Sequence, residues 1–150
     1  MTGNHEYYLK DANEKLDSLK EYGIKTIDNR NIFYDNINII GISDNISDHE
    51  KIKYVQDMVK PGSFNLCIVH QPSIWENIWD DVDMMLSGHT HKGQIFPFYF
   101  LVKLKFKYIY GVYKTKNSTL CVSSGAGTWG PRMRLGSVNE IVKINLHKHK

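Results

Sequence analysis

Two apolar runs in the sequence lead directly into histidine residues. Residues 66–69 precede His70, and residues 82–86 precede the Gly-His-Thr-His element that contains His89 and His91. Short apolar runs bounded by turn residues are typical of buried strands. Residues i and i+2 of an extended segment point the same way, so His89 and His91 are expected to face one site about 6–7 Å apart. This separation favours one ligand on each of two neighbouring metal ions.

The rest of the pattern alternates helix and strand signals before it turns to hairpins. Apolar residues at helical spacing before Gly23, and after a capping box at residues 47–50, predict two helices. A short helix or turn is predicted at residues 75–79. Strands are predicted at residues 24–27, 32–34, 37–42, 64–69 and 82–86, in a hairpin over residues 108–122, and at residues 141–146. This order favours an α/β sandwich with sheets in the middle and helices outside.

Composition narrows the classes of function. The chain of 150 residues has 19 basic and 16 acidic residues, a net charge of +3. This charge alone does not argue for a nucleic-acid partner, since proteins that follow phosphates usually show a concentrated basic stripe. No run of 18 apolar residues could cross a bilayer. Cys67 and Cys121 lie in apolar runs without Cys-x-x-Cys spacing, which predicts two buried free thiols and a reducing, cytoplasmic compartment.

The histidine motifs stand in a fixed order with a third element at the start of the chain. Residues 3–6 read Gly-Asn-His-Glu, His70 and the Gly-His-Thr-His element follow, and the tail carries Ser-Gly-Ala-Gly at residues 124–127 before Arg134. This series resembles the C-terminal part of the calcineurin-like metallophosphoesterases, in particular a bacterial and archaeal branch. Members of that branch are often membrane-associated and hydrolyse phosphodiesters or pyrophosphates. The resemblance implies the family's four-layer α/β sandwich.

The resemblance implies a metal-binding role for four side chains. The amide oxygen of Asn4 would coordinate one divalent ion together with the imidazoles of His70 and His89, and His91 would bind a second ion. Mixed amide and imidazole ligation suits Mn, Fe, Zn, Co or Ni. A dinuclear centre of this kind activates water for attack on phosphorus.

The resemblance also implies catalytic and substrate-binding roles. His5 would stabilise or protonate the leaving oxygen, and Glu6 would orient and charge His5. Arg134 is the candidate for binding a substrate phosphate in a bidentate manner, with an ion pair to Glu140 as the alternative. Lys92 stands where the family usually has Gly.

Two elements that open the family's site, Asp-x-His and Gly-Asp-x-x-Asp, do not occur upstream of residues 3–6. Residues 1–150 are therefore expected to form the C-terminal portion of a single metallophosphoesterase domain, with weak or no activity alone. A non-catalytic remnant or interaction scaffold with the same fold is one alternative. A nuclease-type phosphodiesterase is another, which the mild net charge disfavours.

Residues 95–108 are dense in aromatic side chains and end in alternating lysines. Beside an active-site loop, one interpretation of such a segment is contact with a membrane surface, with its apolar face inward and its lysines toward anionic lipid. Burial under a preceding portion of the domain, or in an ordinary core, would account for the same pattern.

Overall fold

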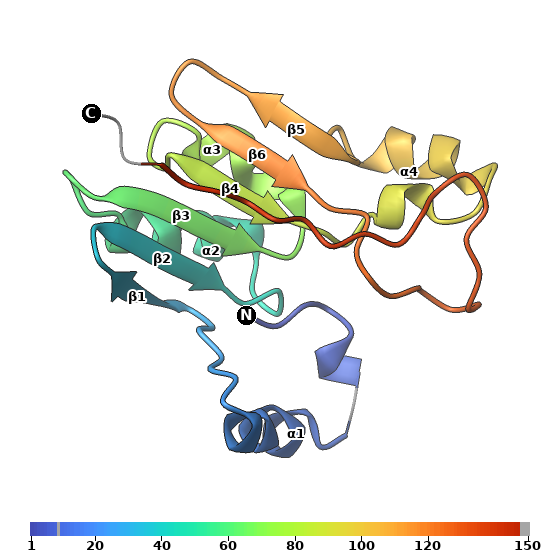
Figure 1. The fold of residues 1–150 in the computed structure, drawn as a ribbon, viewed down its shortest axis with the longest axis horizontal. Coiled ribbons are helices and arrows are strands. Elements are labelled where there is room, and N and C mark those ends of the chain that lie inside the picture. The colour runs from blue at the N-terminus through green and yellow to red at the C-terminus, as the bar shows by residue number, and fades with distance from the viewer. Residues whose placement is uncertain (9, 148–150) are drawn as a thin grey trace.

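The computed structural model describes residues 1–8 and 10–147, which contain a six-stranded mixed sheet (Figure 1). The strands lie in the order β1-β2-β3-β4-β6-β5. The inner four strands are parallel. At the two edges, β1 pairs antiparallel with β2, and β5 pairs antiparallel with β6. The bounds are β1 Arg30–Tyr34, β2 Ile37–Ile42, β3 Phe64–Val69, β4 Met84–Ser87, β5 Gly111–Lys114 and β6 Thr119–Val122.

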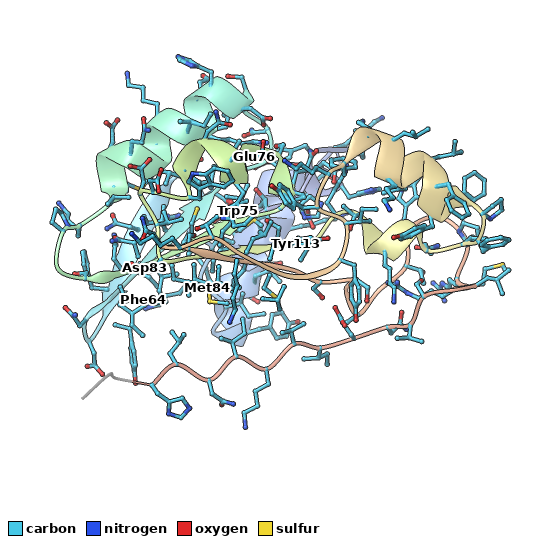
Figure 2. The ribbon with its side chains drawn as sticks, turned by 90° about the horizontal axis from the view of Figure 1, so that it is seen from above. Phe64, Trp75, Glu76, Asp83, Met84 and Tyr113 are labelled. Carbon is cyan, nitrogen blue, oxygen red and sulfur yellow. The ribbon has the colours of Figure 1, made fainter. Side chains whose placement is uncertain are left out.

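Helices α2 and α3 cover one face of the sheet, and the C-terminal segment crosses the other face (Figures 1 and 2). Helix α1 lies away from the sheet, and α4 lies beyond the carboxyl ends of the central strands (Figure 1). The helices are α1 Ala12–Ser18, α2 Asp48–Met58, α3 Trp75–Ile78 and α4 Phe98–Lys105, with short 3-10 turns at Glu6–Tyr8, Leu19–Tyr22, Pro72–Ile74 and His91–Gly93.

The hydrophobic core fills the space between the sheet and helices α2 and α3. Every second residue of β3 is buried, and Cys67 and Val69 on that side belong to the same cluster as Val55 of α2 and Ile78 of α3. Trp75 lies on the helical side of the sheet (Figure 2). The α/β class predicted from the sequence is confirmed, and the described residues contribute a sheet with helices on one of its faces.

Several local predictions are confirmed. The capping box opens α2, since Ser47 Oγ accepts from the Glu50 N–H at 3.3 Å and the Glu50 carboxylate accepts from the Ser47 N–H at 2.9 Å. Gly23 follows the first helical segment in the left-handed conformation that glycine adopts easily. Cys67 and Cys121 are buried free thiols.

Two predicted strands are wrong. Residues 24–27 form no strand, and Ile27 lies directly over Gly41 of β2, where an added Cβ atom would be 2.3 Å from the Ile27 carbonyl oxygen. Residues 141–146 cross the face of the sheet, where no backbone ladder forms, and Ile141 is 90% exposed. In addition, residues 98–105 form a helix that the sequence pattern did not predict.

Candidate metal centre

The loops that follow the parallel strands meet at one edge of the sheet. Strands β2, β3, β4 and β6 all end there (Figure 1), and ligand sites in α/β proteins form outside the carboxyl ends of parallel strands. The Gly88 N–H donates to the His70 carbonyl at 3.0 Å, and the Ser123 N–H donates to the Ser87 carbonyl at 2.9 Å. These bonds hold three of the loops against one another.

At this edge the structure brings together the side chains of Asn4, His70 and His89. Asn4 Oδ1 lies 2.9 Å from His70 Nε2 and 3.2 Å from His89 Nδ1. The two imidazole rings are nearly perpendicular, with centroids 5.0 Å apart. One amide oxygen thus contacts a nitrogen of both rings. The role of the three residues as metal ligands stays a prediction.

The spacing of these donor atoms fits a shared ion. Ligand atoms about 2.1 Å from one ion lie about 3.0–3.4 Å apart at octahedral or tetrahedral angles. The two separations from Asn4 Oδ1, 2.9 and 3.2 Å, are close to those values. Within the described residues, no three His, Cys, Asp or Glu side chains are grouped to hold an ion. As a metal site, the cluster would depend on the Asn4 amide oxygen as its third donor.

The histidines of the site favour their neutral forms. Burial lowers the pKa of His89 to about 4, and the neighbouring His70 acts in the same direction. Burial also lowers the pKa of His70 and of His91, although the Asp44 and Glu6 carboxylates partly offset it at His70. A neutral imidazole offers the lone pair that a metal ion requires.

The extended geometry predicted for residues 89–91 is wrong. His89 and His91 have φ angles of 66° and 48°, and a 3-10 turn begins at His91. The reason is Thr90, which is 5% exposed, donates its N–H to the Gly88 carbonyl at 2.8 Å and donates its hydroxyl to the Ile109 carbonyl. These contacts close a tight turn between the two imidazoles.

Lys92 occupies a backbone conformation that favours glycine, with φ at 53°. This explains physically why a Gly would suit the position. The Lys92 ammonium lies over the Tyr110 ring, 4.2 Å from its centroid, in a cation–π contact that offsets part of the backbone cost.

Arg134 directs its guanidinium to the protein's own backbone. Nη1 donates to the His91 carbonyl at 3.1 Å, and Nη2 donates to the Ser124 carbonyl at 2.7 Å and also to that of Gly127. Glu140 accepts from the Ser124 N–H at 2.8 Å rather than pairing with the arginine. The guanidinium therefore clamps two loops in place of the ion pair with Glu140. A role of Arg134 in binding a substrate phosphate stays a prediction.

The turn that carries Asn4 is fixed by its neighbours. The Glu6 carboxylate accepts from the Gly3 N–H at 2.9 Å, so it holds this turn. Its role in orienting and charging His5 stays a prediction. His5 is exposed and packs edge-on against Tyr8, with ring centroids 5.5 Å apart. A Cβ atom on Gly3 would lie 2.9 Å from the His70 ring, so glycine is required where the backbone passes the imidazole.

A buried ion pair beside His70 was missed from the sequence. Lys51 Nζ lies 2.8 Å from Asp44 Oδ1, and their side chains are 3% and 0% exposed. Gln71 donates from Nε2 to the other carboxylate oxygen at 2.8 Å. The sequence did hold a signal for this residue: Asp44 comes just after the apolar run of β2, and acidic residues at strand ends often face a functional site.

The chain resembles proteins named as metallophosphoesterases. An uncharacterized metallophosphoesterase of Campylobacter jejuni is 40% identical over 99% of this chain and 41% of its own length. One from Aquifex aeolicus is 32% identical over 97% of this chain and 59% of its own length. A Bos taurus transmembrane protein with metallophosphoesterase domain is 29% identical over 97% of this chain and 38% of its own length. No family model matches, and no solved structure gives a significant match.

An α/β fold with imidazole and amide donors at the carboxyl edge of its sheet defines a candidate metalloprotein. The chain belongs to the calcineurin-like metallophosphoesterase superfamily. It spans 41% and 59% of the length of the Campylobacter jejuni and Aquifex aeolicus relatives.

Proposed function

We propose that the protein is a divalent-metal-dependent phosphohydrolase that cleaves a phosphodiester or a pyrophosphate. The observation that supports this best is the contact of one amide oxygen, that of Asn4, with a nitrogen of both His70 and His89. Family membership gives independent support, since the relatives carry the name metallophosphoesterase.

Asn4, His70 and His89 would hold one ion, and His91 would contribute to a second. When bound, divalent ions such as Mn, Fe, Zn, Co or Ni supply Lewis-acid activation of water and of the phosphoryl group. The chain's own residues prepare this site, because burial keeps the imidazoles neutral and the Arg134 clamp holds the loop that carries His91.

His5 would stabilise the leaving oxygen or donate a proton to it. It is exposed and follows Asn4 directly, so its imidazole faces solvent at the border of the candidate centre. An imidazole can donate a proton to a departing oxygen near neutral pH. Glu6 supports this function indirectly, since it fixes the backbone turn that carries both Asn4 and His5.

Activity of these 150 residues alone is expected to be weak. The Asp-x-His and Gly-Asp-x-x-Asp elements of the family are not among them, so the ligand set described here is neutral. A divalent ion held by neutral ligands alone is costly to desolvate.

The test compares two proteins in hydrolysis of bis-p-nitrophenyl phosphate with Mn²⁺. The first protein is this chain alone. The second is a chimera, in which this chain replaces the matched 41% of the Campylobacter jejuni relative. We expect background turnover from the first and clear turnover from the second, which His5→Ala and His89→Ala abolish. The matched control is His49→Ala, an exposed histidine at the start of α2. Turnover that survives loss of His89 would place the chemistry elsewhere.

A further inference from the structure

Helix α4 turns its apolar side chains toward solvent. Phe100, Leu101 and Leu104 are 58%, 60% and 85% exposed, while Tyr99 and Val102 on the opposite side are half-buried. None of the eight residues of α4 is fully buried. A surface helix of a soluble domain normally shows the reverse arrangement, with charged residues outermost. Burial in an ordinary core is therefore not the reason for this composition.

The exposed side chains come from α4 and the segment just before it, and Phe100, Leu101 and Leu104 lie on one face of the helix. We name Phe96, Phe98, Phe100, Leu101 and Leu104 the aromatic patch; the first two are 59% and 55% exposed. The ring centroids of Phe96 and Phe100 lie 6.1 Å apart, and those of Phe100 and Tyr99 lie 5.7 Å apart. Contiguous exposed apolar surface of this kind marks an interaction site.

The charges around the aromatic patch are positive. Lys103 and Lys105 flank the apolar stripe of α4, and Lys107 follows, where it pairs with Glu76 of α3. No acidic residue occurs in the sequence between Asp83 and Glu140. Apolar and aromatic residues on one face of a helix, with lysines beside them, are the arrangement of helices that lie in an anionic lipid interface.

We propose that the aromatic patch docks the protein on the surface of an anionic lipid bilayer. The apolar side chains enter the boundary between headgroups and acyl chains, and the lysines contact lipid phosphates. In the described part of the chain no helix has the length and apolarity to traverse a bilayer, and α4, with eight residues, would lie along the surface.

Docking in this way would place the candidate metal centre next to the lipid headgroups. A Cβ atom on Gly93 would lie 2.4 Å from Tyr99 Cα, so the His91–Gly93 turn is packed tightly on α4. At the other end of the helix, Phe106 contacts the His89 ring with centroids 5.3 Å apart. The helix is therefore in contact with the histidine loop at both of its ends. The docking proposal itself does not depend on the proposed hydrolase activity.

Cosedimentation of the chain with vesicles tests the proposal. We compare vesicles of phosphatidylcholine with phosphatidylglycerol at about three to one against pure phosphatidylcholine, and expect binding to the anionic vesicles that is about tenfold or more tighter. The double variant Leu101→Gln/Leu104→Gln should weaken binding about tenfold or more. Lys103→Gln/Lys105→Gln should weaken binding to anionic vesicles to a similar extent.

The matched control is Val138→Gln/Ile141→Gln, which removes two apolar side chains that are 66% and 90% exposed outside the patch. This variant should bind as the parent does. Circular dichroism confirms that each variant folds. Vesicle binding that is absent, or that Leu101→Gln/Leu104→Gln leaves unchanged, would overturn the proposal. Sedimentation equilibrium that shows a dimer lost in the same variant, without vesicle binding, would assign the patch to a second copy of the chain instead.

Discussion

The position of the His70 ring depends on the absence of a side chain at Gly3. The backbone of Gly3 passes so close to the imidazole that an added Cβ would lie 2.9 Å from Cε1 and Nδ1. Real Cβ atoms do not approach ring atoms so closely, so a larger residue would displace the ring. His70 would then lose its place beside Asn4.

We therefore expect Gly3→Ala to reduce the affinity for Mn²⁺ or Zn²⁺ by about tenfold or more, because it would separate the donor atoms proposed to share an ion. Calorimetric titration measures the effect. Gly127→Ala is the control, since a Cβ there meets no atom within 4 Å. Unchanged metal affinity in Gly3→Ala would show that His70 is not a ligand.

Stability of the metal-free chain should decrease between pH 6.5 and about 4. Burial lowers the pKa of His89 to about 4 and also lowers that of His70 and His91. An imidazole in the unfolded chain binds a proton near pH 6.5. In that window the unfolded state binds more protons than the native state, so the free energy of unfolding falls as pH falls.

Urea unfolding at several pH values measures this dependence, and His89→Gln should make it shallower. His49→Gln, at an exposed position, should leave the dependence as it is. Equal slopes for the parent and His89→Gln would contradict the burial of this imidazole in the native state.

At the scale of elements, Arg134 connects the loops that follow β4 and β6. Its guanidinium donates to carbonyls of His91, Ser124 and Gly127. A hydrogen bond from a charged donor contributes about 1.5–3 kcal/mol to stability, and less where water can replace it, as at the exposed Gly127 carbonyl. We expect Arg134→Ala to lower the free energy of unfolding by at least about 2 kcal/mol.

Arg132→Ala serves as the comparison, because Arg132 is exposed two residues away and its loss should change stability by less than about 0.5 kcal/mol. Denaturant titration gives both values. An Arg134→Ala variant that keeps its stability but loses binding of inorganic phosphate would contradict the stabilising clamp and would support the substrate-binding role predicted from the sequence.

The ion pair of Asp44 and Lys51 joins the loop after β2 to helix α2, and a hydrogen bond from Gln71 joins Asp44 to the loop after β3. Asp44→Asn should cost about 3 kcal/mol, because it leaves the Lys51 ammonium buried with the more exposed Asp48 as its remaining partner. Asp44→Leu/Lys51→Met should recover much of this loss, since an apolar pair of similar volume avoids the desolvation cost.

Asp17→Asn is the control, because its ion pair with Lys20 is exposed and contributes less than about 1 kcal/mol. Thermal unfolding followed by circular dichroism ranks the variants. If Asp44→Asn were no less stable than Asp17→Asn, the buried pair would not be formed in solution.

At the scale of the whole molecule, the sequence located features that depend on local patterns. The apolar run before His70 and the capping box at Ser47 and Glu50 are local, and the structure has a strand and a helix there. The contacts of the Arg134 side chain could not be predicted from the sequence, because its acceptors are backbone carbonyls in two other loops. The same holds for residues 141–146, whose alternating pattern cannot show whether a sheet edge is within reach.

The candidate metal centre joins parts of the chain that are far apart in sequence. Asn4 is 66 residues from His70 and 85 residues from His89. Closing loops of that length costs conformational entropy that only the assembled sheet can repay. Ion binding would therefore report on completion of the tertiary fold, and a bound ion would retard global unfolding rather than any local fraying.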